Sequence, residues 1–364
     1  MTVRSAACCA LLTTVLSLSG WAQQGMNSFT INGSFVNMAA PGKIYLAYFD
    51  TAHYQPTDSA VVTNGKYTFH GKTNGVAHLY ISKTWWDRRS AASAQQLVKA
   101  SDVVELFVEK GVVEVASANG DMEKSVVTGS IPDRDYRQAR HHMTLYVDSL
   151  RAVMKMAQET KNEVLQNSLI SQAFGKLGII IKADYIDFVR QHPASPINIY
   201  LLDQLLKLDD IAKAGWIDSI AGIYRTLPAS VCSSTDGQAF GSYLESELKT
   251  AVGHMAPDFT QNDAQGHPVS LSSLRGKYVF LDFWASGAGN AAQALPVVTK
   301  INENYGSKGL VVLGVSLDKD KASWQQAIQD AGAGSTVQVS DLKGKENAAA
   351  QLYGVTNQIG RAHV

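Results

Sequence analysis

The chain is poor in cysteine. Its 364 residues include three, and two of these, Cys8 and Cys9, lie near the start. Residues 1–22 combine a basic start, an apolar stretch and small residues at the end, which predicts a signal peptide cleaved after Ala22. The apolar stretch is shorter than the ~20 residues of a membrane-spanning helix, so cleavage is favoured over a membrane anchor. Cleavage leaves Cys232 as the single cysteine, which excludes an internal disulfide.

Cys232 lies in the segment LPASVCSSTDG, which has the character of a loop before a helix. Disulfides persist in the compartments that receive exported proteins, yet one thiol cannot form an internal bridge. We interpret Cys232 as a small, semi-buried residue. A reactive thiol at this position is the alternative interpretation.

The chain also has no excess charge and no further long apolar run. Lysine plus arginine and aspartate plus glutamate both number 32, so the formal net charge is zero. This balance does not favour a nucleic-acid partner or an acidic surface. No stretch after the signal peptide is long and apolar enough to cross a membrane, so we expect no transmembrane segment.

Residues 26–120 show short runs of alternating apolar and polar residues separated by turns, which predicts a β-sandwich domain. Asn64 and Gly65 lie between two such runs and predict a two-residue hairpin turn, because both tolerate positive φ. Trp85 and Trp86 form either an exposed aromatic binding patch or part of a loop over the edge of the sandwich. The loop interpretation is favoured.

Residues 132–250 change to apolar residues three and four apart, which predicts a region of amphipathic helices. His192 and Pro193 are expected to end one of them. His141 and His142 are adjacent, and adjacent helical positions point about 100° apart. No acidic or cysteine partner has a matching spacing, so we do not expect a metal ligand here.

Residues 253–358 alternate strands with helices, which predicts a parallel or mixed sheet with helices on both faces. The buried strand KYVFLDFWA is followed by a helix at about residues 290–305, the strand GLVVLGVSL and the helix KASWQQAIQDAG. The strand VQVSDL and the helix ENAAAQLYG complete the pattern. The whole chain is therefore expected to be an α+β multidomain protein.

Three spaced motifs carry a family resemblance. FLDFWAS, VVLGVSLDKDKASWQQAI and AAQLYGVTNQ, in this order, resemble the TlpA-like branch of the AhpC/TSA superfamily, envelope thiol-disulfide oxidoreductases with a thioredoxin-like fold. The resemblance covers residues 253–358. The segments DSAVVTNGKYTFHG and DFVRQHPASPINIYLLDQL are similar to uncharacterised regions that precede such domains in Gram-negative envelope proteins, which implies the periplasm or cell envelope.

The resemblance also implies where the redox site would lie. The family pattern after the central strand is FWAxWCxxCRxExP, with the first cysteine at a helix N-terminus, where the helix dipole favours the thiolate. Asp282 matches the family's buried acid, and Pro296 matches the helix proline. The strand end of the family pattern is matched by Phe283, Trp284, Ala285 and Ser286. Without a cysteine to serve, Asp282 is either a relic or a structural hydrogen-bonding group, and we favour the structural role.

The reactive groups of that pattern are missing. Ala288 and Ala291 take the two cysteine positions, Gly287 replaces the tryptophan, Ala292 the arginine and Gln293 the glutamate. An alanine methyl cannot attack a disulfide or be oxidised to one. No residue is therefore assigned a catalytic role, and no cofactor or metal is expected.

The end of the resemblance raises a separate hypothesis. Residues 359–364, IGRAHV, back-translate to a common sequencing adapter, so we expect them to be an adapter-derived tail. On this hypothesis the natural chain continues past Gln358, and the thioredoxin-like domain is truncated before the family's cis-proline and last strands.

These observations leave three functions open. The first is a redox-inactive envelope protein that keeps the thioredoxin-like shape to bind or scaffold a protein or peptide partner. The second is a thiol-disulfide oxidoreductase or antioxidant of the AhpC/TSA type that uses Cys232 or a partner's thiol. The third is an interaction protein that acts through its β-sandwich. The loss of both cysteines favours the first or the third.

Overall fold

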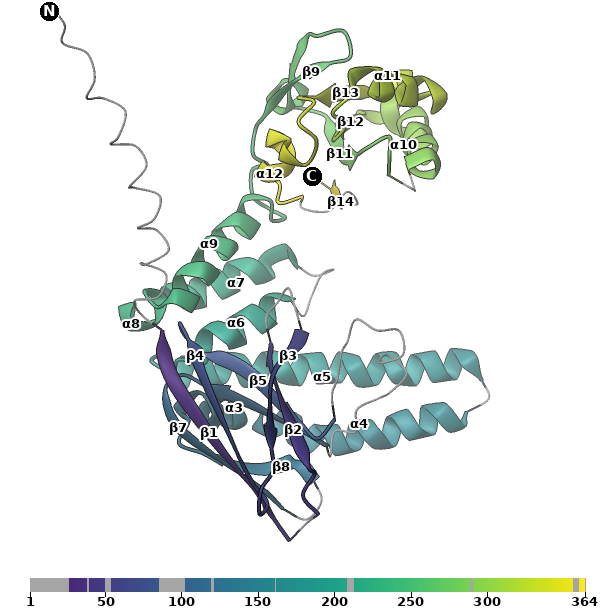
Figure 1. Ribbon diagram of the computed structural model, residues 1–364. Helices are drawn as coiled ribbons and strands as arrows, with labels where there is room; N and C mark the ends of the chain where they lie inside the picture. The colour runs from purple at the N-terminus through teal and green to yellow at the C-terminus, as the bar shows by residue number, and fades with distance from the viewer. Residues whose placement is uncertain are drawn as a thin grey trace, which may run out of the picture. The chain divides into compact units, whose positions relative to one another are not determined.

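The computed structural model divides the chain into two units (Figure 1). One comprises residues 1–208 with 223–240, and the other residues 209–222 with 241–364. The structure describes residues 26–37, 39–49, 54–84, 102–118, 121–160, 162–207, 213–288, 291–355 and 360–363. The predicted signal peptide, Trp85 and Trp86 lie outside the described residues. Two four-stranded sheets and the helices of residues 131–207 belong to the first unit, and a six-stranded sheet belongs to the second.

The strand-rich part of the first unit is a β-sandwich, as expected. Its sheets have the strand orders β4-β1-β7-β8 and β3-β2-β5-β6. Alternate side chains such as Ile31 and Leu79 come from different sheets and are fully buried in one shared core. The strands are β1 Asn27–Val36, β2 Lys43–Phe49, β3 Tyr54–Val61, β4 Lys66–Thr73, β5 Ala77–Ser82, β6 Val103–Val108, β7 Gly111–Ala118 and β8 Asp121–Thr128.

The turn at Asn64 and Gly65 forms, but its flanking strands do not continue as a hairpin. Both residues have positive φ, 52° for Asn64 and 70° for Gly65. Thr63 and Lys66 exchange backbone hydrogen bonds of 2.9 and 3.0 Å. After this single bridge β3 stays in one sheet while β4 pairs with β1 in the other. The turn therefore leads the chain from one sheet of the sandwich to the next. The sandwich also includes β8, which lies beyond the expected boundary at residue 120 because its mixed sequence, DMEKSVVT, gives little strand signal.

The region after the sandwich is helical, as the apolar spacing predicted. Its described helices are α3 Ile131–Ala139, α4 His141–Glu159, α5 Glu163–Gln191, α6 Asn198–Lys207, α7 Lys213–Arg225, α8 Ala229–Cys232 and α9 Thr235–Lys249. Helix α3 is joined to strand β6 by the buried carboxylate of Asp133, which accepts hydrogen bonds from the Phe107 amide (3.2 Å) and from Arg137 Nε (2.7 Å). His192 caps the end of α5, and Pro193 follows it, as expected.

The two adjacent histidines differ from expectation in one respect. His142 does have an acidic partner, because its Nδ1 lies 2.7 Å from a carboxylate oxygen of Asp184 on α5. The other oxygen of Asp184 accepts a hydrogen bond from the Met143 amide at 3.0 Å, so this carboxylate caps the first turn of α4. Sequence spacing did not reveal the pair because its members lie on two helices. Within the described ranges, no three His, Cys, Asp or Glu side chains gather into a metal-binding group.

The second unit is built on a sheet of order β10-β9-β13-β12-β11-β14 (Figure 1). Strands β11, β12 and β13 are parallel, whereas β9 and β14 pair antiparallel with their neighbours. The elements are β9 Thr260–Asp263, β10 Pro268–Ser270, β11 Tyr278–Trp284, α10 Ala291–Tyr305, β12 Leu310–Ser316, α11 Lys321–Asp330, β13 Val337–Ser340, α12 Ala348–Leu352 and β14 Gly360–His363. The expected order of strands and helices is therefore observed. That residues 359–364 derive from an adapter stays a prediction.

Side chains from β11 alternate between the two faces of this sheet. Phe283 packs in a cluster with Tyr353, which follows α12, whereas Trp284 packs against Trp324 of α11. The sheet is therefore covered by helical segments on both faces, as predicted.

Glu105 of β6 forms the centre of a polar cluster between the sandwich and the helices. Its carboxylate accepts hydrogen bonds from His78 Nε2 (2.8 Å), Tyr80 Oη (3.1 Å) and Arg140 Nη1 (2.9 Å). Burial raises the pKa of Glu105, but the hydrogen bond and charge of His78, together with the charge of Arg140, outweigh burial and hold the pKa below its ordinary value.

We predict a pH dependence of stability from this carboxylate. Because its pKa is lower in the folded state, its contribution is complete above the ordinary glutamate pKa of about 4.3 and is lost as the pH falls through the folded value. In urea unfolding measured from neutral to acid pH, the free energy of unfolding should fall more steeply with decreasing pH in the wild type than in Glu105→Gln. Glu114→Gln, at an exposed position of β7, should keep the wild-type slope. Equal slopes in all three proteins would contradict the prediction.

Adjacent valines of β7 give a matched test of the sandwich core. Val113 is 1% exposed and Val112 is 55% exposed, so they lie on opposite faces of one strand. We expect Val113→Ala to lower the free energy of unfolding by about 2 kcal/mol, through lost burial and a cavity. Val112→Ala should cost well below about 1 kcal/mol. Chemical denaturation measures both, and similar losses would argue against the assigned strand faces.

Candidate functional site

The positions that match the family's redox site lie at the carboxyl end of β11. The chain leaves this strand at Ala285, turns with the Ala288 amide donating to the Ala285 carbonyl at 3.1 Å, and begins α10 at Ala291. Ligand sites in α/β sheets are commonly found outside the carboxyl ends of parallel strands. The sequence-predicted frame therefore lies in a position suited to binding.

Asp318 fastens this turn to the end of the neighbouring strand β12. Its buried carboxylate accepts hydrogen bonds from the Ser286 amide (3.0 Å), from Ser286 Oγ (2.7 Å) and from Ser316 Oγ (2.7 Å). Three donors on one carboxylate fix both the backbone and the side chain of Ser286. Sequence reasoning missed Asp318, although its place directly after the strand GLVVLGVSL was a usable signal.

Trp284 is held by its ring nitrogen as well as by packing. Its Nε1 donates to Gln338 Oε1 at 2.9 Å, and Gln338 Nε2 donates to Thr336 Oγ1 at 2.8 Å. Gly314 on β12 makes room for this amide, because a Cβ there would lie 2.2 Å from Gln338 Oε1. Trp284 is thus a buried structural residue, 5% exposed, rather than a surface for partners.

The two alanine positions bring no reactive group to this end of the sheet. Ala288 is partly buried and packs against the apolar cluster that contains Phe283 and Tyr353. Ala291 is the first residue of α10, and Pro296 lies inside this helix, where it cannot donate a backbone hydrogen bond. Asp282 is 4% exposed on β11, two residues before Trp284 and on the same face of the sheet.

Cys232 belongs to the first unit and is partly buried, as expected. It is the last residue of α8 rather than part of a loop, and its Sγ lies 3.7 Å from the Tyr224 carbonyl and 3.8 Å from the Leu227 carbonyl. These are weak thiol hydrogen bonds to the preceding turn. They give Cys232 a packing role within the chain.

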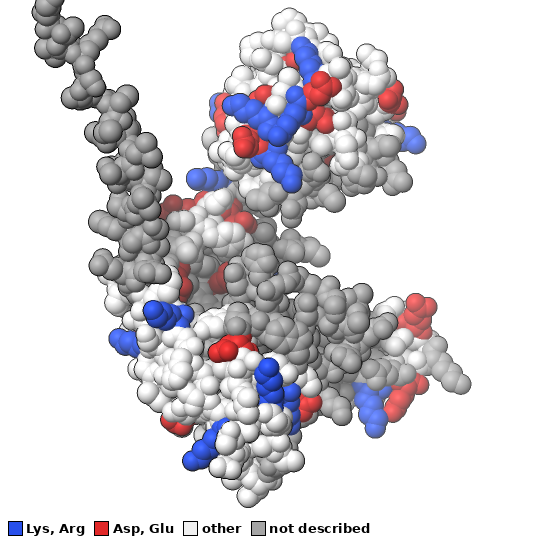
Figure 2. All heavy atoms as spheres, in the orientation of Figure 1, with Lys and Arg blue, Asp and Glu red and all other residues white. Residues whose placement is uncertain are grey.

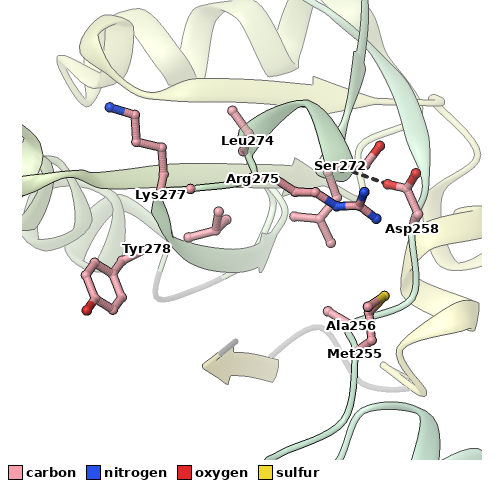
Figure 3. Close-up of a pocket in the computed structure, with 11 residues that line it drawn as sticks. Met255, Ala256, Asp258, Ser272, Leu274, Arg275, Lys277 and Tyr278 are labelled. Atoms are coloured by element: carbon pink, nitrogen blue, oxygen red, sulfur yellow. Dashed lines mark hydrogen bonds between the residues drawn. The ribbon is translucent and has the colours of Figure 1, made fainter.

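An open cavity of about 400 Å³ lies at the opposite, amino-terminal end of β11 (Figure 3). Met255, Leu274, Arg275 and Tyr278 are among its lining residues. Asp258 at its edge accepts a hydrogen bond from the Ser272 amide at 2.8 Å, as Figure 3 shows. Tyr278 is 77% exposed, so the cavity is a shallow surface feature, and the carboxyl end of β11 remains the better candidate site.

The family comparisons agree with this geometry. Residues 252–363 match the AhpC/TSA family, and residues 29–136 match a domain of unknown function, DUF4369. The C-terminal domain is a thioredoxin-like member of the AhpC/TSA family. Its fold and its relationship to thiol-disulfide oxidoreductases, which the sequence motifs predicted, are thereby confirmed.

Individual relatives of this AhpC/TSA domain carry oxidoreductase names. The thiol-disulfide oxidoreductase ResA of Geobacillus kaustophilus is 32% identical over 84 residues, which cover 23% of this chain and 48% of the relative. The thioredoxin-like protein YneN of Bacillus subtilis is 30% identical over 92 residues, covering 25% and 54%. The chain thus spans about half the length of the curated relatives it matches.

Solved structures match a slightly larger share of this chain and are themselves covered more fully. The thioredoxin domain of a thiol-disulfide oxidoreductase from Bacteroides vulgatus is 30% identical, with 29% of this chain and 74% of that chain covered and a TM-score of 0.27. The C-terminal domain of a putative thiol-disulfide oxidoreductase from Bacteroides thetaiotaomicron is also 30% identical, with 30% and 76% covered and a TM-score of 0.28.

The role of Asp318 in the AhpC/TSA domain can be tested by substitution. Asp318→Ala leaves the Ser286 amide and two hydroxyls without their acceptor, so the free energy of unfolding should fall by roughly 2 to 4 kcal/mol. Hydrogen exchange at the Ser286 amide should speed up. Asp330→Ala, at an exposed position of α11, should change stability by less than about 0.5 kcal/mol. Unchanged exchange at Ser286 would refute the assigned role.

Proposed function

We propose that this chain is an exported, redox-inactive member of the AhpC/TSA family that acts as a binding or scaffold protein in the periplasm or cell envelope. The observation that carries the proposal is the pair of alanines, Ala288 and Ala291, at the two positions where the family pattern has cysteine. Thiol-disulfide exchange requires a thiolate to attack a sulfur and a second thiol to release the product. Residues 253–364 contain no cysteine, so this domain supplies neither group.

The surroundings of the alanines support retention of the domain for its shape. Asp318 still holds Ser286 through three hydrogen bonds, and the methyl group of Ala288 packs against the apolar cluster. If the domain had lost its catalytic function and its structure were no longer needed, mutations that remove these contacts would be tolerated. Their presence favours a domain whose surface, rather than its redox chemistry, is used by a protein or peptide partner.

Export is supported by the sequence of residues 1–22, and no described helix is both long and apolar enough to span a bilayer. Among the described residues on the face shown in Figure 2, lysines and arginines are interspersed with acidic residues and make no broad basic patch. This distribution does not favour nucleic acid as the partner.

The proposal predicts an absence of redox turnover. The chain starting at residue 23 should not accelerate insulin reduction by dithiothreitol, and Cys232→Ser should behave in the same way. The double variant Ala288→Cys with Ala291→Cys restores the paired thiols and should gain measurable activity, because the helix start that lowers a thiol pKa is retained. This variant is the positive control for the assay.

Three other outcomes would overturn the proposal or favour another function. Wild-type turnover that disappears in Cys232→Ser would overturn redox inactivity in favour of an oxidoreductase that uses Cys232. Wild-type turnover that survives this substitution would overturn it as well. A third outcome concerns capture of an envelope partner. If removal of residues 23–136 abolishes capture, while variants with substitutions in the C-terminal domain still capture the partner, binding belongs to the β-sandwich instead.

A further inference from the structure

Helices α4 and α5 form a hairpin with almost no core of its own. Figure 1 shows the two helices side by side, extending past the sandwich. Between residues 145 and 182, the buried residues of the described chain are two alanines, Ala157 and Ala173. Several large apolar side chains are instead exposed on the hairpin: Leu145 63%, Met156 60%, Val164 80%, Leu165 49%, Phe174 51% and Ile179 68%.

The exposed face of α4 has the spacing of a helix-packing seam. Leu145, Ser149, Ala152 and Met156 follow one another at intervals of four, three and four residues, and all four are exposed. This spacing places them in one stripe along the helix, the pattern by which two helices interdigitate. None of the four is charged. The stripe is therefore suited to another helix.

The order of side chains within this stripe is self-complementary. Large residues lie at its two ends, Leu145 and Met156, and small ones, Ser149 and Ala152, lie in the middle. In an antiparallel pair about a two-fold axis, Leu145 of one copy would meet Met156 of the other, and the small residues would meet at the centre. Small central residues allow the two helix axes to approach closely, and a two-fold interface uses one patch twice.

We propose that α4 docks antiparallel onto α4 of a second copy of this chain, so that the two α4–α5 hairpins form a four-helix arrangement. The 19 residues of α4 make a helix about 28 Å long. Contact along one helix of this length falls below the roughly 1,200 to 2,000 Å² in total that specific, stable interfaces bury, so the predicted dimer is weak. The dimer therefore dissociates on dilution.

The hairpin's charges favour a second copy over an anionic lipid surface. Residues 164–175 contain no charged side chain, and α4 outside the stripe has two acidic residues, Asp148 and Glu159, and two basic ones, Arg151 and Lys155, so no net charge opposes the approach of a second copy. Helices that lie on membranes usually carry a strongly basic polar face. No such face accompanies this stripe.

Sedimentation velocity of the full chain from residue 23 tests the proposal. The wild type should show a concentration-dependent dimer, and Leu145→Glu or Met156→Lys should each weaken dimerisation at least about tenfold. The combined variant, L145E with M156K, should recover much of the affinity, because opposite charges then face each other across the antiparallel pair. Within one helix these positions are about 16 Å apart, too far to pair. Val126→Glu, at a 62% exposed position on β8, should leave the dimer intact.

Each alternative result would overturn the proposal. A wild type that stays monomeric at all concentrations would do so, whether or not it pellets with vesicles containing phosphatidylglycerol. A dimer whose affinity is unchanged by both single substitutions would place the interface elsewhere. Failure of the combined variant to recover, with circular dichroism showing that it is folded, would exclude the antiparallel pairing.

Discussion

The carboxylate of Asp318 fixes the geometry on which the rest of the candidate site depends. By accepting two hydrogen bonds from Ser286 and one from Ser316, it ties the turn after β11 to the end of β12. A buried carboxylate with three donors is well satisfied, so the turn keeps one conformation. The candidate site is thereby attached to two neighbouring strands of the sheet.

This constraint separates the shape of the site from its chemistry. The frame around the site consists of backbone hydrogen bonds, Trp284 bonded to Gln338, and apolar packing beneath Ala288. None of these interactions involves a thiol. Alanine at the two positions that match the family's cysteines is therefore compatible with the fold. The proposed redox inactivity is consistent with a family relationship to thiol-disulfide oxidoreductases.

The sequence predicted those features that follow from local pattern. The alternation in residues 26–120 predicted the sandwich strands up to β7, and the apolar runs around Phe283 and Val312 predicted the parallel strands of the C-terminal sheet. Features that depend on distant partners were missed. Asn64 and Gly65 predicted a turn but not that its strands belong to different sheets, because strand pairing is decided by the whole sandwich. Asp318 was missed because its role depends on Ser286, a partner 32 residues away. Asp184 was missed beside His142 for the same reason.

The central claim is that the chain from residue 23 onward has no dithiol couple. The most direct measurement is a redox titration: the purified chain from residue 23 is equilibrated across a range of thiol-disulfide potentials, its free thiols are alkylated, and the products are counted by mass spectrometry. The account predicts at most one alkylated cysteine, Cys232, at every potential and no transition between zero and two. A reversible two-thiol step would contradict it.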